Sequence, residues 1–209
     1  MKKFIAACAA LLVFCASAPL AQAATPYAGL SAGVSILTNS DVDKPGGTVE
    51  DGIEYDTGYG LNGAVGLDGG MYRVEGAIGY QVNGVKTFDG DPETDVDVSA
   101  LTFMANGYVD IPMNGAGVEP YLMAGIGVAS VSFNDDSEGI DDSDTVLAYQ
   151  FGGGLAFDAT PNVTVDIGYR YFLTGDVTFD DVDYDGVDGS DVDISVSGHN
   201  IMAGVRVGL

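Results

Sequence analysis

Apolar and polar residues alternate with a period of two through most of this chain. In the segment "MYRVEGAIGYQV" (71–82), the even positions are apolar apart from Gly76, whereas Arg73 and Glu75 lie on the opposite face. Side chains of a β-strand point alternately to its two faces, so a period of two predicts a strand. An apolar face backed by charged residues indicates a sheet with lipid on one side and a polar space on the other.

Eight segments of the chain share this alternation, and each is about 12 residues long. A strand that crosses a bilayer needs about 9 to 11 residues, whereas strands of globular proteins usually have about 5 or 6. The pattern therefore predicts an all-β protein, an eight-stranded antiparallel up-and-down transmembrane β-barrel. The predicted strands are roughly Pro26 to Thr38, Tyr55 to Leu67, Met71 to Val82, Asp97 to Ile111, Pro120 to Phe133, Val146 to Phe157, Val163 to Gly175 and Ile194 to Leu209.

The connections between these segments alternate in length. The short connections are 68–70, 112–119 and 158–162, and the long ones are 39–54, 83–96, 134–145 and 176–193. Short periplasmic turns and long extracellular loops are typical of outer-membrane barrels. Counted with their strand margins, the long connections contain 25 of the 31 acidic residues, so acidic extracellular loops are expected.

The alternation assigns the charged residues of the strands to the barrel interior. In the segment 163–175, Asp166 and Arg170 lie on the inward face, where Phe172 is the one large apolar exception. A charge on the lipid face near the bilayer midplane would cost about 2 to 4 kcal/mol. Eight strands enclose a space that side chains just fill, so the charges are expected to pair across a plugged lumen. The predicted lumen charge network is Arg73, Glu75, Asp166, Arg170 and Arg206.

The first 23 residues have the features of a cleavable secretory signal peptide. A basic start, "MKK", precedes an apolar stretch that ends in "AQA" (21–23). The stretch is too short to span a bilayer. Cleavage after Ala23 would leave residues 24–209 as the outer-membrane barrel and would remove both cysteines, Cys8 and Cys15, so neither disulfides nor cysteine-ligated metals are expected.

The charge of the chain excludes one class of partner. The net charge is −24, and loss of the two lysines of the signal peptide takes it to −26. Nucleic acid phosphates would repel such a protein, so no nucleic acid partner is expected.

Four segments carry a family likeness: "EPYLMAGIGVA" (119–129), "AYQFGGGLAFD" (148–158), "VDIGYRYF" (165–172) and "HNIMAGVRVGL" (199–209). They resemble the outer-membrane β-barrel domains of opacity-type surface antigens and OmpA/OmpX-like proteins. The likeness lies in strand patterns along residues 24–209 and includes no catalytic signature. It implies an eight-stranded barrel in the outer membrane of a Gram-negative bacterium, with surface loops that often act in adhesion or as antigens.

One acidic segment resembles part of a calcium-binding loop. In "DVDYDGVDGSDVD" (181–193), Asp181, Asp183 and Asp185 precede Gly186 as in the first half of such a loop. Val192 stands where a bidentate glutamate would be needed. A solvated loop that binds divalent cations weakly is therefore the favoured interpretation, and neither a specific metal site nor a cofactor is expected.

The single histidine offers one alternative of a catalytic kind. His199 and Ser197 share the outward face, and lipid A deacylases use serine and histidine on the outer wall of a barrel. The order and spacing do not match their His-x-Ser pattern, and no carboxylate lies nearby on that face to orient the ring. A histidine at the boundary between lipid and water is favoured, and no catalytic residue is assigned.

Outward tyrosines are expected to form an aromatic belt at the membrane interfaces. They are Tyr55, Tyr59, Tyr72, Tyr80, Tyr149, Tyr169 and Tyr171. A soluble eight-stranded binding barrel would need polar outer faces, which the last two segments lack. The sequence therefore favours a monomeric barrel, held in outer-membrane lipid, with a structural or surface-interaction role and an extracellular ligand. A small porin-like channel and a hydrolase that modifies lipid A stay open as alternatives.

Overall fold

The computed structural model describes residues 24–38, 40–44, 47–88, 91–92, 96–113, 117–135, 140–184 and 187–209. The predicted signal peptide, residues 1–23, lies outside the described residues. No helix in the described part of the chain is long and apolar enough to span a membrane.

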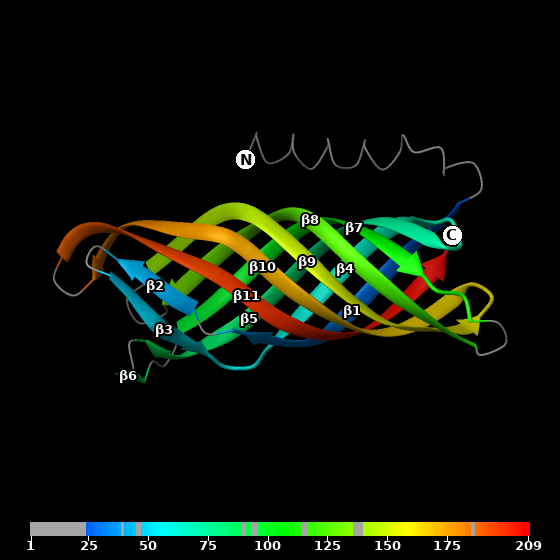
Figure 1. Ribbon diagram of the computed structural model, residues 1–209, viewed down its shortest axis with the longest axis horizontal. Coiled ribbons are helices and arrows are strands. Elements are labelled where there is room, and N and C mark those ends of the chain that lie inside the picture. Colours follow the sequence, from blue (N-terminus) through cyan, green and yellow to red (C-terminus); the bar gives the residue numbers. More distant parts are fainter. Residues whose placement is uncertain are drawn as a thin grey trace.

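Eight long strands form the wall of a closed barrel (Figure 1). Every neighbouring pair is antiparallel, and the pairing of the first wall strand with the last closes the sheet. Closure leaves no open edge at membrane depth, as a strand protein in lipid requires. The predicted eight-stranded antiparallel barrel is confirmed. The wall strands are β1 (Thr25–Leu37), β4 (Gly58–Asp68), β5 (Tyr72–Phe88), β7 (Val96–Asp110), β8 (Val118–Asp135), β9 (Ile140–Thr160), β10 (Val163–Tyr184) and β11 (Val187–Gly208).

The predicted long loops contain more strand than the alternation indicated. A hairpin of β2 (Ser40–Lys44) and β3 (Gly47–Tyr55) pairs with β11 on one side and β5 on the other, and a short β6 (Asp91–Pro92) pairs with β5. The hairpin continues the sheet beyond the point where β1 and β4 end. Backbone groups of the longer strands β5 and β11 are available for pairing there, so a ladder forms without an apolar pattern.

The opposite end of the barrel is closed by short turns and carries the C-terminus (Figure 1). Gly70 has a φ of 90° in the turn between β4 and β5, and its N–H donates to Oδ1 of Asp68 at 2.8 Å. A positive φ is easily adopted by glycine, which allows the tight reversal. The rule of short periplasmic turns makes this the periplasmic end and the β2–β3 end extracellular.

The two faces of the wall differ as the alternation predicted. The outward face carries the large exposed apolar side chains, among them Leu30 with 70% of its surface exposed and Leu122 with 62%. Tyr55, which was assigned to the outward belt, instead packs against an apolar cluster inside the barrel. The assignment was wrong because β3 ends at Tyr55 and β4 begins at Gly58, so the parity of β4 does not extend back to this residue.

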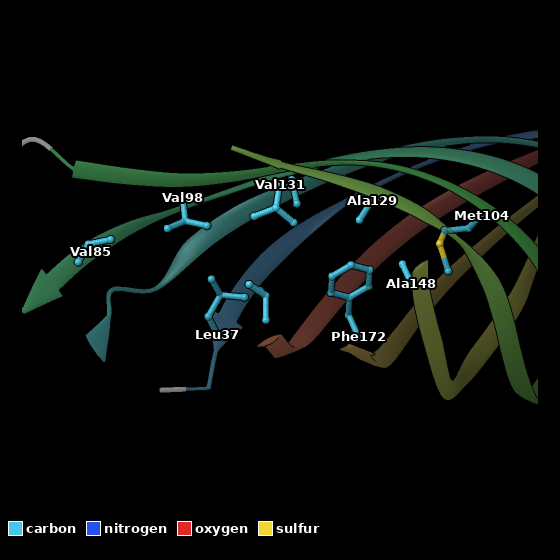
Figure 2. Packing of buried hydrophobic residues seen from close by; sticks show 10 residues of the cluster. Leu37, Val85, Val98, Met104, Ala129, Val131, Ala148 and Phe172 are labelled. Atoms are coloured by element: carbon cyan, nitrogen blue, oxygen red, sulfur yellow. The ribbon is translucent and has the colours of Figure 1, made fainter. Parts of the chain in front are cut away.

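Apolar side chains fill the extracellular part of the interior (Figure 2). This apolar cluster consists of Leu37, Val85, Val98, Ala100, Met104, Ala129, Val131, Ala148, Phe172 and Val196. Phe172, the exception to the alternation of β10, is 3% exposed within it. Toward the periplasmic end, a smaller group of Tyr108, Tyr121, Met123 and Ala156 packs together.

Candidate functional site

The five residues of the predicted charge network line one small cavity inside the barrel. Arg73 and Glu75 come from β5, Asp166 and Arg170 from β10, and Arg206 from β11. The cavity has a volume of about 30 Å³. The wall thus brings together residues that are more than 130 positions apart in the sequence, because β10 lies opposite β5 in the ring of wall strands and β11 is the neighbour of β10.

Arg73 forms a buried two-point ion pair with Asp110, at the end of the neighbouring strand β7. Its Nε donates to Oδ2 at 2.6 Å and its Nη2 to Oδ1 at 2.8 Å. The side chains are 3% and 7% exposed. Charge-assisted bonds of this geometry are among the strongest in proteins. The guanidinium also lies over the ring of Tyr108, with Cζ 4.2 Å from the centroid, which adds a cation–π contact.

Glu75 is held by three uncharged donors. Tyr27 donates to Oε2 at 2.8 Å, while the Tyr108 hydroxyl and the Asn106 amide donate to Oε1 at 2.6 and 2.9 Å. Among the described residues, no arginine lies within ion-pair distance of this carboxylate. Aromatic and amide side chains therefore surround this carboxylate and satisfy it.

Asp166 and Arg206 have weaker partners. The Tyr121 hydroxyl donates to Oδ1 of Asp166 at 3.3 Å, and Arg206 lies 3.9 Å from the carboxylate of Asp68. The Nε atom of Arg206 is buried without a hydrogen-bond partner among the described residues, and so is the hydroxyl of Ser31. Both residues line the 30 Å³ cavity.

Arg170 lies between two cavities. It lines the 30 Å³ cavity and a second one of about 40 Å³, and Asn62 also borders both. The described residues give Arg170 no ion pair within 4 Å, and Tyr108 and Tyr121 line the 30 Å³ cavity together with it. Along β10, Arg170 lies four residues beyond Asp166 in the direction of the extracellular end.

Glycines make room for the large polar side chains of the lumen. The phenol of Tyr121 lies directly over Gly154 and Gly168, where a Cβ atom would collide with it. The ring of Tyr27 covers Gly66 in the same way. Small residues opposite large ones allow an eight-stranded barrel to be filled without voids.

The residues of this polar interior that were missing from the sequence-based network include Tyr27, Asp110, Tyr108 and Tyr121. All four share the inward parity of the residues that were assigned, so the alternation itself contained the signal. Asp110 stands at the last position of its strand, where parity is easily overlooked. Tyrosines are also enriched at membrane interfaces, so a tyrosine in the sequence can belong either to the interfacial belt or to the lumen. The register of the barrel decides between these two locations.

His199 and Ser197, the outward pair considered above as a catalytic alternative, are not arranged as in a catalytic triad. Nδ1 of His199 is hydrogen-bonded to the hydroxyl of Tyr169 at 2.7 Å. The His199 ring also packs against Tyr171, with centroids 5.1 Å apart, and Tyr171 packs against Phe151. His199 is part of an outward aromatic group, and Ser197 is not its hydrogen-bond partner.

The acidic segment that resembles part of a calcium-binding loop lies mostly outside the described side chains. Asp185 lies outside the described residues, as do the side chains of Asp181 and Asp183. Within the described part of the chain, no group of three or more potential metal ligands is present.

A closed antiparallel barrel with an apolar outer wall and a charged, filled interior defines the class of integral outer-membrane β-barrel proteins. The family model of the outer membrane protein beta-barrel domain matches residues 6–207. The chain belongs to that family and is a protein of the Gram-negative outer membrane.

Relatives with known sequences match parts of the chain. The outer membrane protein PagN of Salmonella typhimurium is 28% identical over 118 residues, which are 52% of this chain and 49% of PagN. An uncharacterized protein of Brucella abortus is 34% identical over 93 residues, 38% of this chain and 32% of that protein. The chain therefore spans about half or less of the length of these curated relatives.

Two solved structures share the fold over most of their length. Neisserial surface protein A, NspA, has a TM-score of 0.57 at 21% identity, with 88% of this chain and 97% of NspA covered. The outer membrane protein OprG of Pseudomonas aeruginosa has a TM-score of 0.54 at 16% identity, with 91% and 99% covered. At these identities the likeness concerns the barrel fold.

Proposed function

We propose that this protein is a monomeric, non-enzymatic barrel whose extracellular end interacts with other surfaces, while its lumen stays closed. The observation that carries this proposal is the continuation of the sheet beyond the barrel wall. The β2–β3 hairpin pairs with β5 and β11, and β10 and β11 each have 22 residues. A paired sheet presents a recognition surface in a fixed geometry, which lowers the entropy lost on binding.

The composition of this end supports a polar partner. Most of the acidic residues of the chain fall in the extracellular segments. We infer that the partner is a basic or divalent-cation-bridged surface, because clustered carboxylates attract positive charge and repel anionic polymers. The similarity to a protein named as a surface protein, NspA, agrees with a role outside the cell.

The filling of the interior supports the closed lumen. The apolar cluster and the ion pair of Arg73 with Asp110 occupy the two parts of the barrel. The two polar cavities, of about 30 and 40 Å³, hold only a few water molecules, since one water needs at least about 10 to 15 Å³. A porin-like channel would need a continuous column of water, so the channel alternative is disfavoured.

The hydrolase alternative is disfavoured by the surroundings of His199. Its Nδ1 is hydrogen-bonded to a tyrosine hydroxyl, whereas a catalytic histidine needs a carboxylate or carbonyl to orient it toward a nucleophile. Export by a signal peptide cleaved after Ala23 completes the proposal and accounts for delivery to the outer membrane.

The experiment that tests the proposal removes the hairpin and keeps the barrel. A variant in which residues 40–53 are replaced by a short Gly-Ser link should still insert into the outer membrane and show a heat-modifiable folded band. Bacteria that display it should adhere less to basic surfaces or host matrix than bacteria that display the intact protein. A matched variant with the periplasmic connection 112–116 rebuilt as Gly-Ser controls for general damage. Unchanged adhesion in the hairpin variant would contradict the surface role.

A further inference from the structure

The interior of the barrel is divided into an apolar layer and a polar chamber. Seven of the eight wall strands contribute side chains to the apolar cluster, all except β4. Val131 and Val196 are completely buried in it, and Phe172 is its largest side chain. Figure 2 shows the ring of Phe172 among the side chains of Leu37, Ala129 and Ala148. The layer therefore brings apolar side chains into the lumen from all of the wall except the β4 side, where the buried polar side chains of Ser35 and Asn83 lie beside it.

The polar chamber lies directly on the periplasmic side of this layer. Along the inward face of β10, Asp166, Arg170 and Phe172 follow one another toward the extracellular end. Phe172 borders the 40 Å³ cavity, and Arg170 connects that cavity with the 30 Å³ cavity. At the periplasmic boundary of the chamber, Nη1 of Arg206 is 3.9 Å from Oδ2 of the partly exposed Asp68. The periplasmic boundary is therefore polar, and the ion pair across it is long.

The chamber contains hydrogen-bonding groups that the protein leaves without partners. The Nε atom of Arg206 and the hydroxyl of Ser31 are buried and unpaired among the described residues, and the guanidinium of Arg170 has no ion pair there. Buried charged groups are stable only when they are hydrogen-bonded. The cavities are large enough for about two or three water molecules each.

Water fits these groups better than an ion does. Asp166 and Glu75 line the 30 Å³ cavity together with three arginines. A bound anion would lie close to the carboxylates, and a bound cation would lie close to the guanidinium groups. Water can donate to the carboxylates and accept from the arginines at the same time.

We propose that the lumen is a water-filled, charge-lined chamber that is sealed on the extracellular side by the apolar layer around Phe172, and that the charged residues hold this water without forming the seal. The inference rests on the closed lumen of the proposed function. An ion that enters a narrow hydrocarbon layer loses its hydration without gaining a partner, so such a layer blocks ions by excluding water. In this proposal, one layer of apolar side chains separates the polar chamber from the extracellular side of the barrel.

Planar-bilayer recordings of four folded proteins test the seal: the wild type, Phe172→Ser, Phe172→Leu and Arg170→Gln. The wild type should be silent. Phe172→Ser should give currents at least ten-fold above the wild-type baseline. The smaller, polar side chain would let water from the 40 Å³ cavity enter the apolar layer. Phe172→Leu keeps the layer apolar and should stay silent, and so should Arg170→Gln, which alters only the chamber. Heat-modifiable migration confirms folding in each case.

A second measurement shows that the current passes through the chamber. Adding Asp166→Asn to Phe172→Ser removes a carboxylate from the chamber and so lowers its preference for cations. The reversal potential under a salt gradient should therefore shift toward the equilibrium potential of the anion. If Phe172→Ser gives no folded band, the near-isosteric pair Val131→Thr and Val196→Thr hydrates the same layer and should conduct instead.

The outcomes separate the two proposals. Steady currents from the wild type would contradict the closed lumen itself. A silent wild type together with a silent, folded Phe172→Ser, or with a conducting Arg170→Gln, would overturn only the assignment of the seal to the apolar layer. An unchanged reversal potential in the Asp166→Asn double variant would likewise overturn the path through the chamber.

Discussion

Glu75 and Arg73 are two positions apart on β5 and share the inward face, yet each is neutralised in a different way. Arg73 has a carboxylate partner in Asp110, whereas Glu75 accepts hydrogen bonds from Tyr27, Tyr108 and Asn106. The Tyr108 ring connects the two groups, since its hydroxyl bonds Glu75 and its face lies under Arg73. Neutral donors around an acid allow the charge to be buried without a second ion.

This difference predicts an order of stabilities for three variants. Asp110→Asn leaves the buried guanidinium of Arg73 uncompensated and should cost about 3 to 5 kcal/mol. Glu75→Gln replaces one carboxylate oxygen with an NH₂ group. That group cannot accept the hydrogen bond that the facing side chain donates, which should cost about 1 to 3 kcal/mol. Asp68→Asn, at the partly exposed pair with Arg206, should cost less than about 1 kcal/mol. Urea unfolding of each barrel in lipid vesicles measures the free energies, and equal losses for all three would contradict the network described above.

The wall strands illustrate how alternation translates into a membrane face. Ile167 is half-exposed on the outer face of β10, and Thr164 lies on the inward face of the same strand, where its hydroxyl bonds Asp158 at 2.9 Å. The alternation predicted this division for nearly every wall residue. Phe172, which looked like an interruption of the pattern, lies in the apolar cluster.

A pair of arginine substitutions checks the two faces. Ile167→Arg should lower the yield of folded protein in liposomes strongly, since an arginine facing lipid near the midplane costs about 2 to 4 kcal/mol. Thr164→Arg, near the periplasmic end and beside Asp158, should insert much better. Comparable folded-band yields for the two variants would show that the assigned faces are wrong.

Asn83 secures the point where β1 and β4 separate. Its side-chain amide donates to the carbonyls of Ser35 and Asp56, at 3.0 Å each, and the side chain is almost fully buried. These two bonds take the place of the ladder between β1 and β4, which ends at the pair of Ser35 with Gly58. The amide therefore joins the membrane barrel to the β2–β3 hairpin.

Replacing Asn83 should loosen this junction. Asn83→Ala removes the donor to the buried carbonyl of Ser35 and to the partly buried carbonyl of Asp56, and should lower the free energy of unfolding by about 1 to 3 kcal/mol. Hydrogen exchange of the Ser35–Leu37 and Gly58–Gly60 backbone should increase more than that of the periplasmic turns. Asn162→Ala, in an exposed turn, serves as the control. Protection unchanged from the wild type at the junction would argue against the role of the amide.

At the scale of the whole molecule, charge is distributed very unevenly. The chain has 31 acidic and 7 basic residues, and all three arginines after residue 23 are inside the barrel. Acidic residues are concentrated in the extracellular segments. The exterior of the folded protein is therefore strongly anionic at one end.

Insertion should depend on the charge of the lipid surface. Folding from urea into vesicles of anionic phospholipid should be slower than into zwitterionic vesicles, and salt should remove most of the difference, since the screening length falls to about 8 Å near physiological ionic strength. Time courses of the heat-modifiable band at low and high salt measure this. An anionic surface that does not slow folding at low salt would contradict the assigned distribution of charge.

The strands, their order and the inward face could be predicted from the sequence because each depends on a local period. The partners of the lumen charges depend on the stagger between strands, which the sequence does not display. Parity placed Arg73 inside, but only the register brings it to Asp110 instead of Glu75 or Asp166. The β2–β3 hairpin was predicted as a loop because its sequence has no apolar alternation. Its strands form through backbone pairing with β5 and β11, which the sequence does not display.

The 22-residue length of β10 and β11 sets how far the protein stands above the lipid. A strand rises about 3.4 Å per residue and is tilted by about 40° in such barrels, so it advances about 2.6 Å per residue along the barrel axis. The hydrocarbon band is about 25 Å tall, which leaves about 30 Å of paired strand beyond it. A large ligand such as an antibody would therefore meet the extracellular ends of these strands well clear of the lipid surface.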